Sequence, residues 1–124
     1  MLKMPKLQYV SYKDGRLAYR EAGKGPDLFF LHGMNGSSRS WFHIFEVLAP
    51  SFHVVAWDAP SFGASDVFGD KIEDYVDAAK ALMQAVKIRE AIVVGHSMGG
   101  VIATQLAADR ECSTAGLVLS STHL

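Results

Sequence analysis

The 124-residue sequence predicts a single α/β domain with a mostly parallel sheet, an antiparallel hairpin at its N-terminus and helices on both faces. Two observations support this prediction. Apolar runs without polar alternation, such as Leu28–Leu31 and Ala91–Val94, are typical of parallel strands covered on both faces. They alternate with longer segments whose apolar residues recur at helical spacing. Because 49% of the residues are hydrophobic and the net charge is −1, we expect the chain to fold rather than stay disordered.

The first expected element is a β-hairpin. Tyr9–Lys13 and Arg16–Glu21 alternate in polarity. Asp14 and Gly15 between them form a typical two-residue turn, because both residue types tolerate a positive φ. The stretch Gly23–Pro26 then breaks the pattern before the first buried strand.

Helices and strands then alternate along the chain. Ser38–Leu48 places its apolar residues on one helical face and ends before Pro50, and His53–Trp57 is strand-like. Lys71–Val86 is the clearest helix, with apolar residues at i, i+3, i+4 and i+7 and with Asp70 as its expected N-cap. The remaining expected elements are a strand at Ala91–Val94, a helix at Met98–Asp109 and a strand at Leu117–Leu119.

Composition excludes several classes of partner. The 12 basic and 13 acidic residues are balanced, which argues against a nucleic acid or an anionic membrane surface. No apolar run is long enough to cross a bilayer, and Met1–Val10 lacks the apolar core of a secretory signal. The single cysteine, Cys112, cannot form an internal disulfide, so we expect a reducing, cytoplasmic location. We expect a small, buried or half-buried side chain at a helix end; a reactive thiol is the alternative.

The segment Gly95–Gly100 reads Gly-His-Ser-Met-Gly-Gly and lies where a strand is expected to end and a helix to begin. A serine at such a sharp turn needs small neighbours, because a Cβ at Gly95 or Gly99 would collide with the backbone. Ser97 would then project its hydroxyl above the strand ends, beside a helix N-terminus that favours negative charge. We expect His96 to support this turn and to point away from the reaction.

Two other interpretations of this turn are weaker. One is a glycine-rich connection without chemistry, although chance rarely places this pentapeptide at a strand–helix junction. The other is a phosphate-binding loop, but the sequence has neither a Gly-Lys-Ser/Thr ending nor Gly-x-Gly-x-x-Gly spacing there. The pattern therefore favours a nucleophilic serine.

A second loop, His32–Ser38, follows the first buried strand. Alone it would be a flexible Gly/Ser connection. With the serine turn, it can direct a backbone N–H toward the same point, so the amides of Met34 and Met98 are the expected oxyanion donors, and Gly33 supports the loop. A third stretch, Asp58–Ser65, is by itself only a turn.

In order and spacing, these three motifs resemble the N-terminal half of an α/β-hydrolase-fold protein. Asp58–Ser65 is similar to the family's Asp-x-(Arg/Pro)-Gly-x-Gly-x-Ser turn, except that Ser61 stands where a glycine is usual. The resemblance implies one partial core domain over residues 1–124, without the family's cap and C-terminal strands and helices. Haloalkane dehalogenases and epoxide hydrolases of this fold carry aspartate at the elbow. Ser97 therefore implies acyl chemistry on esters, lactones, thioesters or activated ketones, through an acyl-enzyme.

A serine nucleophile needs a histidine base and an acid, and in this family both follow the elbow. Downstream of Ser97 the chain offers Asp109, Glu111 and His123. The two acids lie roughly 16 Å away along the expected helix and cannot orient a base at the elbow. His123 precedes the usual cap position, so we do not expect it to be the base. We therefore expect a fragment whose acid and base come from a missing C-terminal half.

The other histidines have simpler interpretations. We expect His32 to pack or form hydrogen bonds within its loop and His53 to start a strand. His43 and Glu46 lie one helical turn apart, but two ligands do not make a metal site. We expect no metal and no cofactor.

The sequence thus predicts a serine hydrolase for small acyl substrates that is inactive without its C-terminal half. Apolar residues near the expected mouth favour a hydrophobic acyl or aromatic group, although Trp41 is more simply a core residue; the set is Met34, Trp41, Phe62 and Met98. The alternatives are a non-catalytic binding protein and an inactive fragment. The open apolar edge of the last strand is expected to pair with a second chain, the C-terminal half or another copy.

Overall fold

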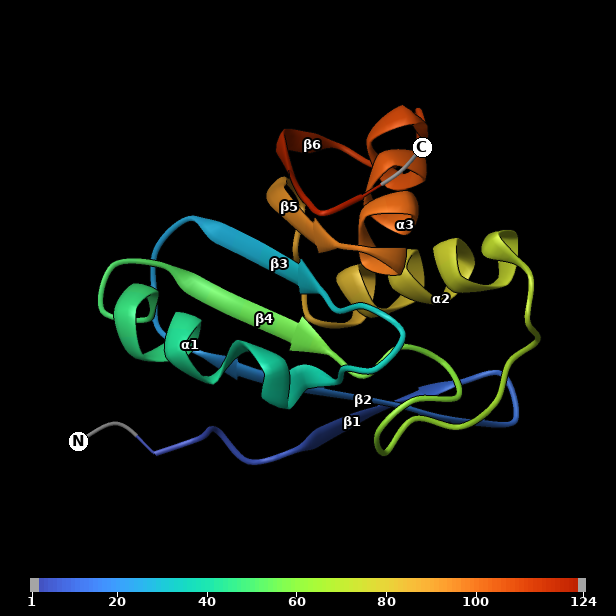
Figure 1. Cartoon of the computed structure of the whole chain (residues 1–124), viewed down its shortest axis with the longest axis horizontal. Helices are drawn as coiled ribbons and strands as arrows, with labels where there is room; N and C mark the ends of the chain where they lie inside the picture. The colour runs from blue at the N-terminus through green and yellow to red at the C-terminus, as the bar shows by residue number, and fades with distance from the viewer. Residues whose placement is uncertain (1–2, 123–124) are drawn as a thin grey trace.

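The computed structural model of the chain describes residues 3–122, which form one six-stranded sheet with the order β1-β2-β4-β3-β5-β6 (Figure 1). The first hairpin and the β2–β4 pair are antiparallel, whereas β4, β3, β5 and β6 run parallel. The predicted α/β class, with its N-terminal hairpin and mostly parallel sheet, is confirmed. The strands are β1 (Gln8–Tyr12), β2 (Gly15–Ala22), β3 (Asp27–Leu31), β4 (His53–Trp57), β5 (Ala91–His96) and β6 (Thr114–Ser120).

Helices cover both faces of the sheet, as predicted. A 3₁₀ turn and α1 lie on one face, and α2 and α3 lie on the other (Figure 1). The helical elements are η1 (Ser38–Trp41), α1 (Phe42–Leu48), α2 (Ile72–Ala85) and α3 (Met98–Ala108).

Alternating side chains of the central strands build two cores. In β3, Phe29 faces α2 and α3, whereas its neighbour Phe30 faces α1. Trp57 packs edge-on against Phe29, with ring centroids 5.9 Å apart, and Trp41 packs against Phe30 at 4.9 Å. Both indole nitrogens are buried, and neither has a hydrogen-bond partner among residues 3–122. Each core therefore contains one tryptophan.

The hairpin turn lies one residue earlier than the sequence predicts. Tyr12 pairs with Gly15 in the β1–β2 ladder, so the two turn residues are Lys13 and Asp14, and Lys13 has a φ of 51°. Gly15 is needed for another reason. A Cβ there would lie 2.7 Å from Asp66 Oδ2, because the 61–68 loop packs against this end of the hairpin.

The N-cap predicted for one helix is wrong, and another predicted helix starts with a separate turn. Lys71, not Asp70, is the N-cap of α2, and its N–H donates to Asp74 Oδ2 at 3.1 Å. The predicted helix over 38–48 begins as a separate 3₁₀ turn, since Ser37 and Ser40 form a capping box that satisfies its first amides. Periodicity locates such helices but does not show which side chain satisfies the free N–H groups at their ends.

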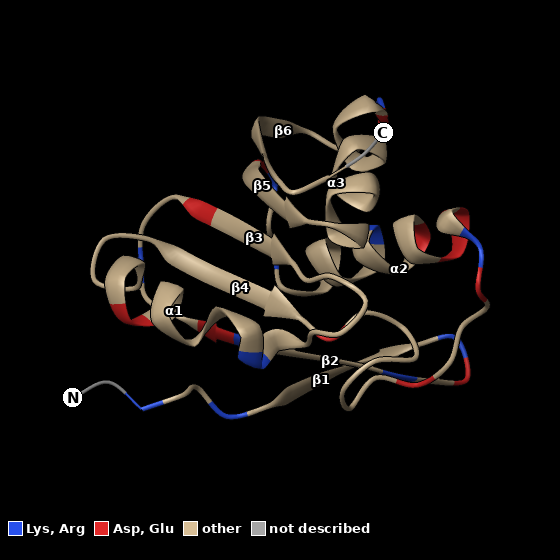
Figure 2. Ribbon diagram, in the orientation of Figure 1, with Lys and Arg blue, Asp and Glu red and all other residues tan. Residues whose placement is uncertain are grey.

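The described sheet ends at β6, which pairs only with β5. Neither β5 nor β6 contains a charged residue, so both ribbons are tan in Figure 2. Leu117, Val118 and Leu119 are 38%, 50% and 39% exposed. Within residues 3–122, no helix has the length and hydrophobicity that crossing a membrane requires.

Candidate active site

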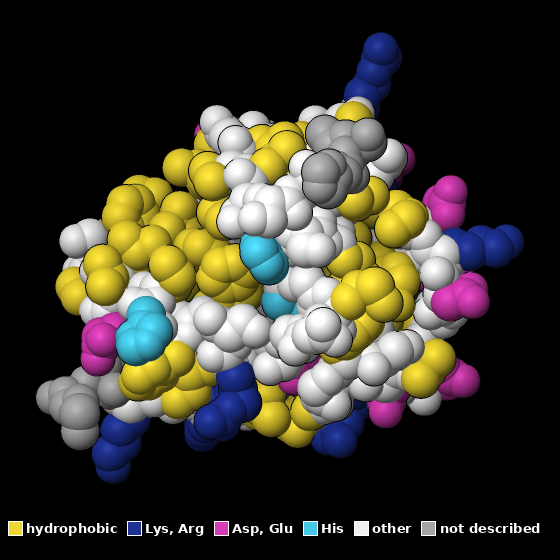
Figure 3. Space-filling view, in the orientation of Figure 1, with side chains coloured by type: hydrophobic (Ala, Val, Ile, Leu, Met, Phe, Trp, Pro, Cys, Tyr) yellow, Lys and Arg dark blue, Asp and Glu magenta, His cyan; other side chains and the backbone are white. Residues whose placement is uncertain are grey.

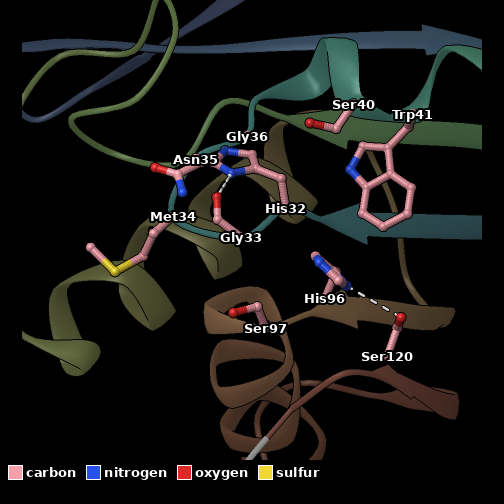
Figure 4. A pocket seen from close by; sticks show the side chains of 10 residues that line it. All are labelled: His32, Gly33, Met34, Asn35, Gly36, Ser40, Trp41, His96, Ser97 and Ser120. Carbon is pink, nitrogen blue, oxygen red and sulfur yellow. Dashed lines mark hydrogen bonds between the residues drawn. The ribbon is translucent and has the colours of Figure 1, made fainter.

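A cavity of about 480 Å³ opens where β3 and β5 end (Figure 4). In the space-filling view, histidine side chains lie near the middle of this face, next to a broad patch of hydrophobic side chains (Figure 3). The 32–38 loop and the 95–100 turn both line the cavity, so residues as far apart in the sequence as Gly36 and His96 come together. Its lining residues are His32, Gly33, Met34, Asn35, Gly36, Ser40, Trp41, His96, Ser97 and Ser120.

Ser97 occupies the turn between β5 and α3. Its φ of 55° and ψ of −119° are unusual for a residue with a side chain, so the backbone is strained there. The strain is held by hydrogen bonds on both sides: Ser97 N–H donates to Ser120 O at 2.9 Å, and Gly100 N–H donates to Ser97 O at 2.9 Å. The side chain is exposed and extends toward the loop that carries Met34 (Figure 4).

Two glycines allow this turn to pack against the sheet. A Cβ on Gly95 would lie closer than 3.0 Å to the Gly99 carbonyl, and one on Gly99 would lie that close to the Leu31 and His32 carbonyls. Real Cβ atoms essentially never approach other atoms so closely. The steric reason that the sequence predicts for these glycines is therefore present in the structure.

The two amides expected to bind an oxyanion belong to the loop and the helix that meet near Ser97: Met34 lines the same cavity, and Met98 follows Ser97 in the chain. Met98 is the first residue of α3, where an N–H has no acceptor within the helix. Gly33, which precedes Met34, is so near that its added Cβ would lie 3.1 Å from Ser97 Cβ. The Met34 side chain is 65% exposed at the cavity mouth. The arrangement can place two N–H donors beside the Ser97 hydroxyl, although their role in catalysis stays a prediction.

His32 connects the 32–38 loop to the β4–α2 connection. Its buried ring lies with Nδ1 2.7 Å from Gly33 O, and Nε2 accepts the Ala59 N–H at 3.0 Å. Because Nε2 accepts, Nδ1 carries the proton and donates to the carbonyl, so the ring is neutral. Burial lowers the pKa of His32, despite the opposing effects of the Gly33 carbonyl and Asp58. The ring thus forms the expected bond within its loop and a second one outside it.

Asp58 is a buried residue that sequence reasoning treated only as part of a turn. Its Oδ1 accepts the Ser38 N–H at 2.7 Å, and its Oδ2 accepts the Ala64 N–H at 2.9 Å. The Ser38 hydroxyl in turn accepts Arg20 Nε–H at 2.9 Å. This network fixes the end of the 32–38 loop at Ser38. The sequence signal that could have identified Asp58 is its place as an acidic residue directly after a buried strand.

The backbone at Ser61 shows why a glycine is usual at this position. Its φ is 74°, a left-handed conformation that glycine adopts without strain. We expect Ser61→Gly to raise the free energy of unfolding by roughly 1 kcal/mol, measured by urea denaturation. Ser51→Gly is the matched control, because Ser51 is an exposed turn residue without a positive φ and glycine there should destabilise the fold. Equal effects of both changes would contradict the strain argument.

His96 lies in the cavity wall, contrary to the expectation that it points away from the reaction. Its ring is exposed beside Ser97, and Nδ1 is 3.2 Å from Ser120 Oγ (Figure 4). The reason is the β5–β6 register, which pairs His96 with Ser120 on the face that carries α1. Of the residues expected at the mouth, Met34 and Trp41 line the cavity, whereas Phe62 and Met98 pack against the core.

The downstream acids lie away from Ser97, as predicted. Asp109 and Glu111 follow the far end of α3, where Lys80 Nζ contacts them at 3.0 and 3.1 Å. The hydrogen bond from Lys80 holds the pKa of Asp109 below its usual value. His123 lies outside the described residues. Among residues 3–122, the Ser97 hydroxyl has no hydrogen bond to a histidine.

The remaining candidate residues have structural roles. His43 Nδ1 lies 3.8 Å from Glu46 Oε1, both exposed, and residues 3–122 contain no group of three metal-ligating side chains. His53 starts β4, as predicted. Cys112 is half-buried near Met83, and burial raises the pKa of its thiol, which favours the unreactive form.

Comparison with known proteins adds to this geometry. The sequence profile of the alpha/beta hydrolase fold matches residues 26–124. The chain belongs to the α/β-hydrolase fold family. An uncharacterized protein of Mycobacterium tuberculosis is 33% identical over 105 residues, covering 83% of this chain and 31% of that protein. The 2-hydroxy-6-oxo-6-phenylhexa-2,4-dienoate hydrolase of Comamonas testosteroni is 33% identical over 112 residues, covering 85% and 39%.

Solved structures show the same fold. Est816, described as an N-acyl homoserine lactone degrading enzyme, superposes with a TM-score of 0.87 and 29% identity, over 93% of this chain and 45% of that one. The α/β-hydrolase chain described here therefore spans less than half the length of each of these relatives. Of the relatives described here, the Comamonas testosteroni protein is named a hydrolase and Est816 a lactone-degrading enzyme.

Proposed function

We propose that this chain carries the nucleophile and the oxyanion hole of a serine hydrolase acting on carboxylic esters, lactones, thioesters or activated carbon–carbon bonds. One observation supports this more than any other. A serine with a left-handed φ stands at a strand–helix junction and lines a cavity next to the first N–H groups of a helix. A turn with a purely structural role does not need a residue with a strained backbone and a side chain exposed in a cavity.

In the proposed reaction, the Ser97 oxygen attacks the substrate carbonyl carbon while a base takes its proton. The developing negative charge on the carbonyl oxygen is stabilised by the N–H groups of Met34 and Met98 and by the N-terminal end of α3. Collapse of this intermediate breaks the bond to the leaving group, which takes the proton from the base, and leaves an acyl-serine. Water then hydrolyses the acyl-serine with help from the same base.

The base and the acid are proposed to come from polypeptide outside this chain, since the longer relatives extend well beyond the matched region. Ser97 also argues against reactions on haloalkanes and epoxides. An acyl-serine is hydrolysed when water attacks its carbonyl carbon, whereas a serine alkylated by such a substrate would have no carbonyl to attack. A non-catalytic binding protein is the second candidate. The observation that favours it is the lack of a histidine bonded to the Ser97 hydroxyl within residues 3–122.

A fluorophosphonate probe tests the proposal, because it reacts with serines that a base activates. We expect the protein extended by its natural C-terminal polypeptide to be labelled, and Ser97→Ala to abolish labelling. Without that polypeptide, labelling should be slower by about 10³-fold or more, as when a triad is incomplete. Ser51→Ala, an exposed serine outside the cavity, is the control and should leave labelling unchanged. An extended protein that folds but remains unlabelled would favour the binding protein.

A further inference from the structure

His53 lies between two carboxylates at the end of the sheet opposite the candidate active site. Its Nε2 is 2.7 Å from Glu21 Oε1 on β2, and its Nδ1 is 2.7 Å from Asp27 Oδ1 at the start of β3. The three side chains are between 20% and 28% exposed, so water only partly screens them. One ring thus joins three neighbouring strands.

These two contacts define the protonation state of the ring. Ionised carboxylates only accept hydrogen bonds, so both ring nitrogens must donate, and this requires the imidazolium form. A neutral ring could donate to only one carboxylate, and the other would face a lone pair in a half-buried position. Burial lowers the pKa of His53, but the hydrogen bonds that its ring donates to Glu21 and Asp27 outweigh burial and raise the pKa above 6.5.

Other titratable residues lie on the elements around this cluster. Tyr19 lies two residues before Glu21 on β2, and Lys24 lies in the β2–β3 connection. Lys87, Arg89 and Glu90 lie in the α2–β5 connection, which leads to Ala91, the β5 residue that pairs with Asp27. None of these residues forms an ion pair with the cluster among residues 3–122. The α1–β4 connection over 49–52 has no titratable side chain. Within the described residues, Glu21 and Asp27 are therefore the ionic partners of His53.

The cluster lies next to two closely packed loops. Gly23 and Gly25 have φ values of 89° and 134°, and a Cβ on either would collide with backbone carbonyls of residues 49–52. The His53 N–H donates to Pro26 O at 3.0 Å and closes this contact. The strands that start here, β3 and β4, end at the loops that carry His32 and Asp58.

We propose that Glu21, Asp27 and His53 form a proton-operated latch. The imidazolium holds the 23–26 loop against the 49–52 loop and fixes the starts of β3 and β4. Loss of its proton leaves one carboxylate without a donor, and the 23–26 loop then separates from the 49–52 loop. The latch is independent of the proposed hydrolase function.

The direction of the pH effect follows from linkage. Because the folded state binds the His53 proton more tightly than the unfolded state, the stabilisation is fully present below pH 6.5 and is lost as the pH rises through the raised pKa. His32 has the opposite effect. Its pKa is lowered, so its contribution is complete above pH 6.5 and declines at lower pH. Of these two histidines, only His53 changes its contribution to stability above pH 6.5, so a titration toward alkaline pH reports on the latch.

Nuclear magnetic resonance on the 124-residue chain tests the latch. The ring resonances of His53 should titrate above 6.5, and the exchange rate of its backbone amide, corrected for intrinsic pH dependence, should rise about tenfold or more with the same midpoint. In His53→Gln this exchange should be fast and independent of pH. His43→Gln is the control, because His43 is 88% exposed on α1 and should leave the profile unchanged.

Single carboxylate variants keep the test decisive if His53→Gln does not fold. Glu21→Gln and Asp27→Asn each remove one ionic acceptor, so each should lower the midpoint of the His53 titration and of the amide exchange together. A His53 midpoint at or below 6.5, or amide exchange that does not follow the ring titration, would overturn the proposal.

Discussion

A Gly99→Ala variant is expected to lose at least about 3 kcal/mol of unfolding free energy, which is enough to unfold many domains of this size. The new Cβ would meet the Leu31 and His32 carbonyls at the end of β3, and a strand backbone cannot move aside as a flexible side chain can. Circular dichroism during urea denaturation measures the loss. The effect would appear whether or not Ser97 is a nucleophile, because it concerns packing alone.

Gly116→Ala provides the matched control for this variant. Its added Cβ would lie 3.6 Å from Ile92 Cγ1, an ordinary contact, in a strand where alanine is favoured over glycine. We expect its stability to equal or exceed that of the unmodified chain. If Gly99→Ala had the urea midpoint of Gly116→Ala, the steric account of the turn would be wrong.

The second large effect is expected at β6. We expect the 124-residue chain by itself to self-associate, because this strand offers unpaired backbone groups and apolar side chains without a charge. Val118→Lys places a charge on the open strand and should weaken association by about tenfold or more. Val47→Lys is the control, since Val47 is 70% exposed on α1, away from this strand. Light scattering and sedimentation measure the change.

A monomer at concentrations on the order of 100 µM would contradict this prediction. The same strand is also where we propose that a second chain or the C-terminal half pairs. Adding that half to the chain should then suppress self-association, since both compete for one row of backbone groups.

The positions of strands and helices could be predicted because burial imposes a period on the sequence. β3 and β4 are apolar on both faces, as expected for strands between two layers of helices. The ends of these elements follow other rules. Lys13 adopts a positive φ although its residue type does not favour it, because packing at Gly15 sets the register of the hairpin.

The candidate site was only partly predictable. The strand–turn–helix position of Ser97 follows from a local pattern. The hydrogen bond between Ser38 and Asp58 joins residues 20 positions apart, and no local sequence pattern indicates such a contact. The orientation of His96 depends on its pairing with Ser120, which the sequence alone does not specify. Buried polar networks are set by tertiary structure and have to be observed.

The distribution of the two tryptophans has a practical consequence. Trp57 lies in the core beneath α2 and α3, and Trp41 lies in the core beneath α1. Each layer therefore contains its own intrinsic fluorophore: Trp57 is fully buried, and Trp41 is partly buried beside the cavity. Replacing one indole by phenylalanine leaves an emission signal that reports on a single layer, so loosening of the two sides of the molecule can be followed separately in the same solution.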